Sequence, residues 1–108
     1  MKRYVAGFLF SNDCQRVALI LKKRPDWQAG RWNAIGGTVE DGEDSDVAMT
    51  REFEEEAGVL VQSWSLRVVL RGDRKLTSAG PWKVKFYAQW DTLALERVRS
   101  VTDEMVAV

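Results

Sequence analysis

The chain has 108 residues, 45% of them hydrophobic, and it carries 16 Lys and Arg residues against 16 Asp and Glu residues. A chain of this length forms one domain, here residues 1–108, with a small hydrophobic core. Because the charges balance, a strongly basic surface is excluded, and nucleic acid is not an expected partner. The single cysteine, Cys14, and the lack of histidine exclude a disulfide framework, zinc sites built on cysteine or histidine, and histidine catalysis.

Two strands are expected in the first part of the chain. Residues 4–10 and 16–21 are rich in β-forming residues and are separated by a Ser-Asn-Asp turn, so they predict a hairpin. The first apolar stretch is too short for a signal peptide, and no segment is long enough to span a membrane. We therefore expect no membrane partner and a cytoplasmic location. Residues 22–31 are predicted to form a polar loop, and residues 32–35 a short extended segment.

A helix and further strands are expected in the rest of the chain. Residues 44–57 contain good helix formers without Gly or Pro, Asp44 suits the N-cap, and Gly58 suits a left-handed C-cap. The remaining elements are, in order, a strand over 59–70 that breaks near 62–63, a charged loop over 71–80, a strand over 82–90, a turn or short helix over 93–98, and a strand over 105–108. Several strands with one long helix indicate an α/β fold.

The most specific pattern covers residues 37–59, GTVEDGEDSDVAMTREFEEEAGV. It has the form G-x5-E-x7-R-E-φ-x-E-E-x-G-φ, where φ is apolar, and every fixed position is filled. On a helix, Glu52, Glu55 and Glu56 lie at i, i+3 and i+4 and share one face, where Ala48 leaves room one turn earlier. The opposite side, which can pack inward, carries Met49, Phe53 and Ala57.

Acidic helix faces are most often only solvated, but the surroundings of this one favour a metal site. Clustered carboxylates repel one another unless a cation lies among them, and oxygen ligands suit Mg²⁺ or Mn²⁺. Gly36 and Gly37 allow the backbone to approach an ion, and a Gly36 carbonyl could be a ligand. Arg51 and Glu43 are expected to pair and to fix the preceding loop against the helix.

The filled pattern resembles the signature of the Nudix hydrolases, which cleave nucleoside diphosphates linked to another group. This resemblance implies an α/β/α sandwich with a mixed sheet, and a cofactor of Mg²⁺ or Mn²⁺ held by the carboxylates named above. It also implies that Gly37, Glu43, Arg51 and Gly58 support the site.

Members of the family usually carry a further C-terminal helix, and this chain ends where that helix would begin. The strand over 82–90 alternates strictly, with Trp82, Phe86 and Trp90 on one face, which is typical of a half-buried strand. We expect that this chain does not cover the face by itself. Either the chain is truncated, or a second subunit covers the face. The second alternative predicts a homodimer.

The segment 22–37, KKRPDWQAGRWNAIGG, resembles the matching part of MutT-like enzymes, especially the oxidised-purine nucleoside triphosphatases. This implies that Asn33 bonds a purine edge and that Trp27 flanks the base, for which an amide and an indole plane are suited. The alternative is that both residues only pack the loop. The cluster Lys22-Lys23-Arg24 could meet the polyphosphate or be solvated.

The Thr-Asp-Glu run at 102–104 lies where the family often has one more acid. Glu104 and Asp103 are candidates for a catalytic base, an extra metal ligand or base recognition, and a plain turn is the alternative. We take Glu104 as the catalytic candidate and Asp103 as the substrate-binding one.

Three functions are compatible with these residues. The favoured one is a Mg²⁺-dependent pyrophosphohydrolase that converts nucleoside triphosphates to monophosphates and pyrophosphate and could cleanse modified purine nucleotides. The second keeps the enzyme class but acts on ADP-ribose, a dinucleoside polyphosphate or capped RNA, for which no extra motif is present. The third is a non-catalytic nucleotide sensor, although such domains usually lose the carboxylates that this chain keeps.

Overall fold

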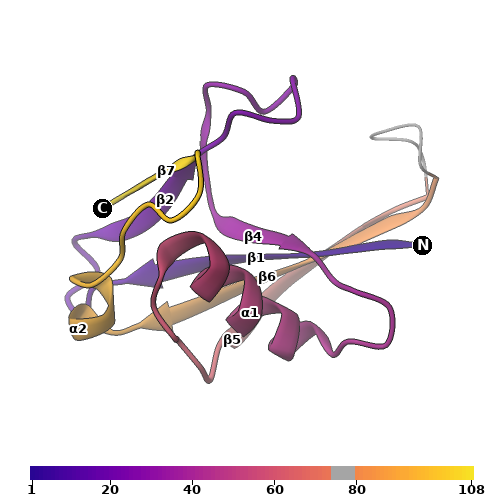
Figure 1. The fold of residues 1–108 in the computed structure, drawn as a ribbon. Coiled ribbons are helices and arrows are strands. Elements are labelled where there is room, and N and C mark those ends of the chain that lie inside the picture. Colours follow the sequence, from indigo (N-terminus) through magenta and orange to yellow (C-terminus); the bar gives the residue numbers. More distant parts are fainter. Residues whose placement is uncertain (74–79) are drawn as a thin grey trace.

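The computed structural model describes residues 1–73 and 80–108. The elements are β1 (Lys2–Phe10), β2 (Val17–Leu21), β3 (Trp32–Asn33), β4 (Ile35–Thr38), α1 (Ser45–Ala57), β5 (Ser65–Gly72), β6 (Trp82–Trp90), α2 (Thr92–Leu95) and β7 (Met105–Ala107). The α/β class predicted from the sequence is confirmed (Figure 1). The loop predicted over 71–80 lies partly outside the described residues.

The sheet is mixed, and β1 is its central strand. The order is β3-β2-β1-β6-β5, with β4 also paired to β1 and β7 also paired to β2. β1 runs parallel to β6 along its whole length and antiparallel to β2 and β4, so the predicted hairpin is confirmed. Because β4 pairs with β1 at Tyr4–Gly7, the Gly36-Gly37 pair lies beside Ala6 and Val5, in the middle of the domain.

Helix α1 begins and ends as its sequence predicts. The Asp44 side chain accepts a hydrogen bond from the Asp46 backbone at 2.8 Å, and Gly58 adopts a left-handed φ of 74°. Met49, Phe53 and Ala57 are fully buried against the sheet, as expected. Ala48, one turn before Glu52, is fully buried in the same core.

Strand β6 packs into the core with the face that carries the more polar residues of its alternating sequence. Tyr87 is 1% exposed, packs in the core below α1 and donates a hydrogen bond from its hydroxyl to Asp46 Oδ1 at 2.7 Å. The apolar series that includes Trp82, Val84 and Phe86 lies on the other face and is only half-buried. Alternation therefore predicted the strand, whereas the position of α1 decides which face is covered.

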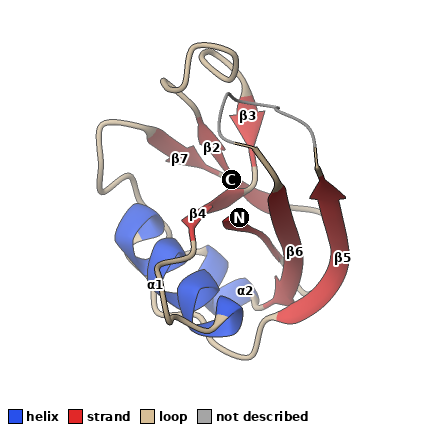
Figure 2. Ribbon diagram, turned by 90° about the vertical axis from the view of Figure 1, so that its right-hand side faces the viewer, coloured by secondary structure: helices blue, strands red, loops and turns tan. Residues whose placement is uncertain are grey.

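Both helices lie on one side of the sheet (Figure 2). Residues of α1 and α2, among them Phe53 and Leu95, belong to one hydrophobic cluster. Within residues 1–73 and 80–108, no helix lies on the opposite face of β1, β5 and β6. No helix of the described chain is long and apolar enough to cross a membrane.

The strand expected over 59–70 starts later, at Ser65. Residues 59–64 are irregular, Ser63 has a φ of 60°, and the Gln89 amide donates to the carbonyls of Gln62 and Ser63 at 2.9 and 2.8 Å. These bonds satisfy backbone oxygens that a strand ladder would otherwise use, which explains the late start.

Candidate active site

Arg51 is the centre of an ion-pair network that joins α1 to the loop before it. Its Nε and Nη2 atoms donate to the two oxygens of Glu43 at 2.8 and 2.9 Å, and Nη2 also donates to the Thr38 carbonyl at 3.0 Å. The guanidinium thus ties the loop before α1 and the end of β4 to the helix. The predicted pairing of Arg51 with Glu43 is present, and it is bidentate.

The same guanidinium also reaches the acidic face of α1. Arg51 Nη1 donates to Glu52 Oε1 at 3.0 Å and to Glu55 Oε2 at 3.2 Å. The Arg51 hydrogen bond lowers the pKa of Glu43 to about 2, and these carboxylates raise the pKa of Arg51 above its ordinary value. The Arg51–Glu43 pair therefore stays charged at neutral pH.

Glu52 and Glu56 are the two shielded carboxylates of the acidic face. A Cβ atom at Gly37 would come within 2.5 Å of the Glu52 carboxyl, so the absence of a side chain there lets Glu52 lie directly against β4. Burial raises the pKa of Glu52, although the hydrogen bond from Arg51 opposes this. Glu55, in contrast, is 56% exposed.

Glu56 combines a buried, unpartnered oxygen with a raised pKa. Its Oε2 atom is buried and has no hydrogen-bond partner. Burial, helped by the nearby charge of Glu52, raises the Glu56 pKa to about 7, against opposing effects of Lys22 and of a hydrogen bond from the Gly36 backbone. A buried, unsatisfied carboxylate oxygen requires a proton or a cation as a partner.

The donor set suits a hard divalent cation, because it consists of carboxylates beside a glycine backbone. Glu56 offers an oxygen that has no hydrogen-bond partner, and the charge of Glu52 is near enough to raise the pKa of Glu56. In the described residues, however, no three Asp, Glu or Cys side chains converge closely enough to hold one ion as they stand. The contacts of Arg51 with Glu52 and Glu55 account for this, since both carboxylates are turned toward the guanidinium.

Glu104, which directly precedes β7, lies near this acidic group and is 4% exposed. Its Oε1 atom accepts from Lys22 Nζ at 3.1 Å, and its Oε2 atom accepts from the Lys23 backbone at 2.7 Å. Burial opposes ionisation of Glu104, but these bonds outweigh it and lower the pKa of the carboxyl. Asp103 is different: its side chain is 54% exposed and pairs with Arg24 at the surface.

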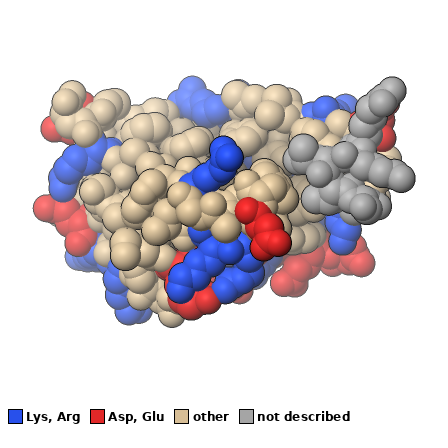
Figure 3. Space-filling model, turned by 90° about the horizontal axis from the view of Figure 1, so that it is seen from above, with Lys and Arg blue, Asp and Glu red and all other residues tan. Residues whose placement is uncertain are grey.

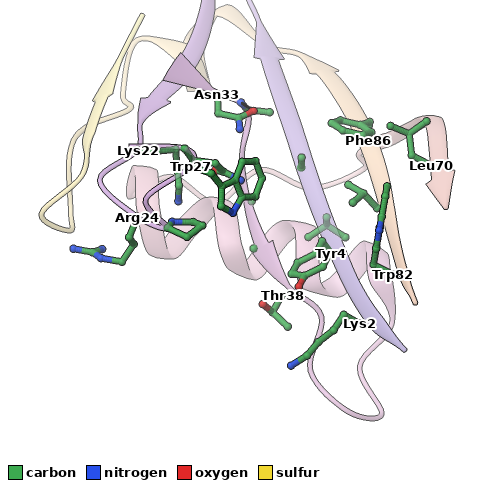
Figure 4. A pocket seen from close by; sticks show the side chains of 18 of the residues that line it. Lys2, Tyr4, Lys22, Arg24, Trp27, Asn33, Thr38, Leu70, Trp82 and Phe86 are labelled. Atoms are coloured by element: carbon green, nitrogen blue, oxygen red, sulfur yellow. Dashed lines mark hydrogen bonds between the residues drawn. The ribbon is translucent and has the colours of Figure 1, made fainter. Parts of the chain in front are cut away.

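A cavity of about 590 Å³ lies on the open face of the sheet (Figure 4), and no residue of α1 lines it. Trp27 and Asn33 line it from the loop side, and Tyr4, Trp82 and Phe86 line it from the sheet. Asp103 is not among its lining residues. Gly36 and Gly37 line the cavity as well, so the backbone of β4 separates it from Glu52 and Glu56.

The cavity wall combines aromatic surface with positive charge. Its charged residues are Lys2, Lys22 and Arg24, and no Asp or Glu of the described chain lines it. Elsewhere, both signs of charge are scattered over the surface, as in the view of Figure 3. The cavity therefore suits an anion that carries a flat apolar group.

The sequence did not assign Tyr4, Trp82 or Phe86 to the site. The sequence signal that these three residues share is the alternation of side chains along β1 and β6. The two strands are parallel neighbours, and Tyr4 pairs with Val84 and Ala6 with Phe86. Residues that pair in this way point to the same face of a sheet.

Residues 1–105 match the NUDIX domain family. The chain belongs to the Nudix family. Its helix α1 and the preceding glycines carry the Nudix signature.

Relatives of this Nudix domain agree with the assignment. An oxidized purine nucleoside triphosphate hydrolase of Mus musculus is 47% identical over 49 residues, which are 45% of this chain and 31% of that protein. The match thus spans less than a third of the length of this curated relative. Among solved structures, a MutT Nudix hydrolase of Burkholderia pseudomallei has a TM-score of 0.79 at 23% identity, covering 99% of this chain and 78% of its own.

A further solved structure, from a study of MutT of Aliivibrio salmonicida and Vibrio cholerae, has a TM-score of 0.68 at 26% identity. It covers 98% of this chain and 77% of its own. The fold and the family are therefore shown over nearly the whole chain.

Proposed function

We propose that this Nudix domain is a pyrophosphohydrolase that uses Mg²⁺ or Mn²⁺ to convert nucleoside triphosphates to monophosphates and pyrophosphate, with modified purine nucleotides as substrates. The observation that carries the proposal is the buried, unpartnered Glu56 oxygen beside a cationic cavity with aromatic walls. A nucleotide has the matching parts, namely a flat base and a polyphosphate that brings a cation. The partial likeness to an oxidized purine nucleoside triphosphate hydrolase supports the choice of substrate.

Glu52, Glu55 and Glu56, with the Gly36 carbonyl, are the residues that we propose to hold the metal. A divalent ion held there would stabilise the charge of the substrate phosphates and would make a bound water more acidic. To hold the ion, Glu56 would have to be ionised and Glu55 would have to leave its contact with Arg51. Arg51 then keeps Glu52 and the loop in place through its bonds to Glu43 and Thr38.

The base is proposed to enter the cavity between the loop and the sheet. Trp27 is 52% exposed and offers a stacking plane, and the Asn33 amide can both donate and accept, although its oxygen already bonds the Ala34 backbone at 2.8 Å. The phosphates would then extend past Gly36 and Gly37 toward the acids, with Lys22 between the two regions. We no longer assign Asp103 to base recognition, because it lies at the surface outside the cavity lining.

An assay across a nucleotide panel with Mg²⁺, scored for pyrophosphate against orthophosphate, tests the proposal. We expect pyrophosphate from purine nucleoside triphosphates, with a preference for an oxidised purine. ADP-ribose, a dinucleoside polyphosphate and a capped RNA belong in the same panel. Turnover of one of these instead would replace the proposed substrate, and nucleotide binding without any turnover would indicate a sensor. The cytoplasmic location expected from the sequence remains a prediction.

We also propose that a second copy of the chain covers the part of the open sheet face that carries Phe8, Phe10 and Trp90, none of which lines the cavity. Phe8, Phe10 and Trp90 form a stacked row there, with ring centroids 6.2 and 5.8 Å apart, and Arg67 lies over Trp90 at 5.0 Å. A row of this kind that stays partly exposed is typical of a surface that is covered in solution. Sedimentation at micromolar concentration should give a dimer, which Phe10→Glu dissociates, and a stable monomer would exclude it.

A further inference from the structure

Both carboxylate oxygens of Glu104 are engaged by the loop that walls the cavity. Oε1 accepts from the Lys22 ammonium at 3.1 Å and Oε2 from the Lys23 backbone at 2.7 Å, while the side chain is almost completely buried. A second cation, Arg24, lies 4.0 Å from Oε2. Each oxygen of the Glu104 carboxylate thus accepts a hydrogen bond from this loop.

The loop that Glu104 contacts is itself closed at the same point. The Lys22 backbone donates to the Arg31 carbonyl at 2.9 Å and accepts from Gly30 at 2.8 Å. Inside the loop, Gln28 donates to the Pro25 carbonyl at 2.8 Å. The segment 22–31 therefore behaves as one compact unit, whose orientation depends on how its two ends are held.

The other side of the contact is rigidly placed. Glu104 directly precedes β7, which pairs antiparallel with β2 from Leu21↔Met105 onward. The Glu104 backbone is held in turn by a bond to Thr102 Oγ1 at 3.2 Å. Glu104 thus connects the paired strands β2 and β7 to the loop 22–31. This loop carries Trp27, which lines the cavity (Figure 4).

We propose that Glu104 is a positioning residue, which fixes the loop 22–31 and with it the Trp27 side of the cavity. This assignment replaces the sequence-based expectation that Glu104 is a catalytic base. It rests on the proposed function for the identity of the ligand, a nucleotide, but not for the effect on the loop.

Amide hydrogen exchange of the nucleotide-free protein tests the positioning directly. In Glu104→Ala, peptides that cover residues 22–31 should exchange about tenfold faster or more, because a hydrogen bond to a charged group is lost. Glu104→Gln should fall between wild type and Ala, since its carbonyl can still accept from Lys23 while its amide faces the Lys22 ammonium. Glu96→Gln, which neutralises an exposed acid, is the control.

Unchanged exchange of this loop in a folded Glu104→Ala protein would overturn the proposal. If the Ala variant does not fold, the Gln variant decides, because a loop that exchanges as in wild type would show that the charged bonds do not hold it. This result is independent of turnover, so it stands even if the nucleotide assay fails.

Kinetics then separate positioning from base catalysis. With the preferred nucleotide, a positioning role predicts a KM raised about tenfold in Glu104→Ala, a smaller change in kcat, and partial rescue by Gln. A general base predicts the opposite: kcat collapses equally in the Ala and Gln variants while KM is kept. The second result would contradict the proposal.

Discussion

Replacing Arg51 with Met should destabilise the domain at neutral pH and slow any turnover. Met keeps the aliphatic stem but removes all five donated bonds, which reach Glu43, Glu52, Glu55 and the Thr38 carbonyl. Glu43 and Glu52 are only 12% and 14% exposed, so both would remain as shielded charges without a partner.

The expected loss is about 2–4 kcal/mol. A fall of the Glu43 pKa from 4.5 to about 2 corresponds to about 3 kcal/mol at neutral pH, with solvent screening reducing it. The unpaired Glu52 and the lost Thr38 bond add to that amount. A depressed pKa stabilises the fold above pH 4.5, and the contribution fades as pH falls toward 2. The difference between wild type and variant should therefore shrink in acid.

Urea unfolding followed by tryptophan fluorescence measures this difference. The exposed Arg97→Met is the matched control and should change the free energy of unfolding by less than about 0.5 kcal/mol. An equally small change in the free energy of unfolding of Arg51→Met would refute the reasoning, because changes of that size are typical of exposed ion pairs. Wild-type stability combined with lost activity would mean that Arg51 contacts substrate.

Three other results are expected. In metal-free protein, the free energy of unfolding should fall as pH rises from 4.5 to about 7, because folded Glu56 binds its proton more tightly than the unfolded chain does. The raised pKa of Glu52 acts in the same direction, so Glu56→Gln should reduce this slope in urea titrations without removing it. An undiminished slope in Glu56→Gln would show that the slope does not come from Glu56. Gly37→Ala should displace the Glu52 carboxylate, because the added Cβ atom would lie 2.5 Å from it. Calorimetry should then show weaker Mn²⁺ binding, and an unchanged Mn²⁺ affinity would count against Glu52 as a ligand. Asn33→Ala should reduce kcat/KM unevenly across bases, by about 1–3 kcal/mol for the preferred purine, whereas an equal loss on all nucleotides would mean that Asn33 only shapes the loop.

The parts of the fold that local signals specify were predictable. Helix α1 was predicted within one residue, since Asp44 and Gly58 supply its caps by themselves. The pairing of Arg51 with Glu43 followed from fixed offsets in one short segment, and the contacts confirm it. The hairpin of β1 and β2 needed only β-forming residues and a turn.

The rest depends on contacts between distant segments. Tyr87 is buried because its hydroxyl reaches Asp46, 41 residues away, and no local pattern contains this pair. The aromatic cavity wall formed by Tyr4, Trp82 and Phe86 needs the parallel register of β1 and β6. The burial of Glu104 likewise requires β7 to pair with β2, so the sequence alone left its role open.

The central claim, that the acidic face of α1 drives pyrophosphate release, has one direct test. Pyrophosphate release from the preferred nucleotide should be measured with Mg²⁺ for wild type and Glu56→Gln, alongside Mn²⁺ binding and a check of the fold. The account predicts a folded variant that binds Mn²⁺ more weakly and turns over orders of magnitude more slowly. Unchanged turnover in that variant would contradict the metal assignment and the mechanism built on it.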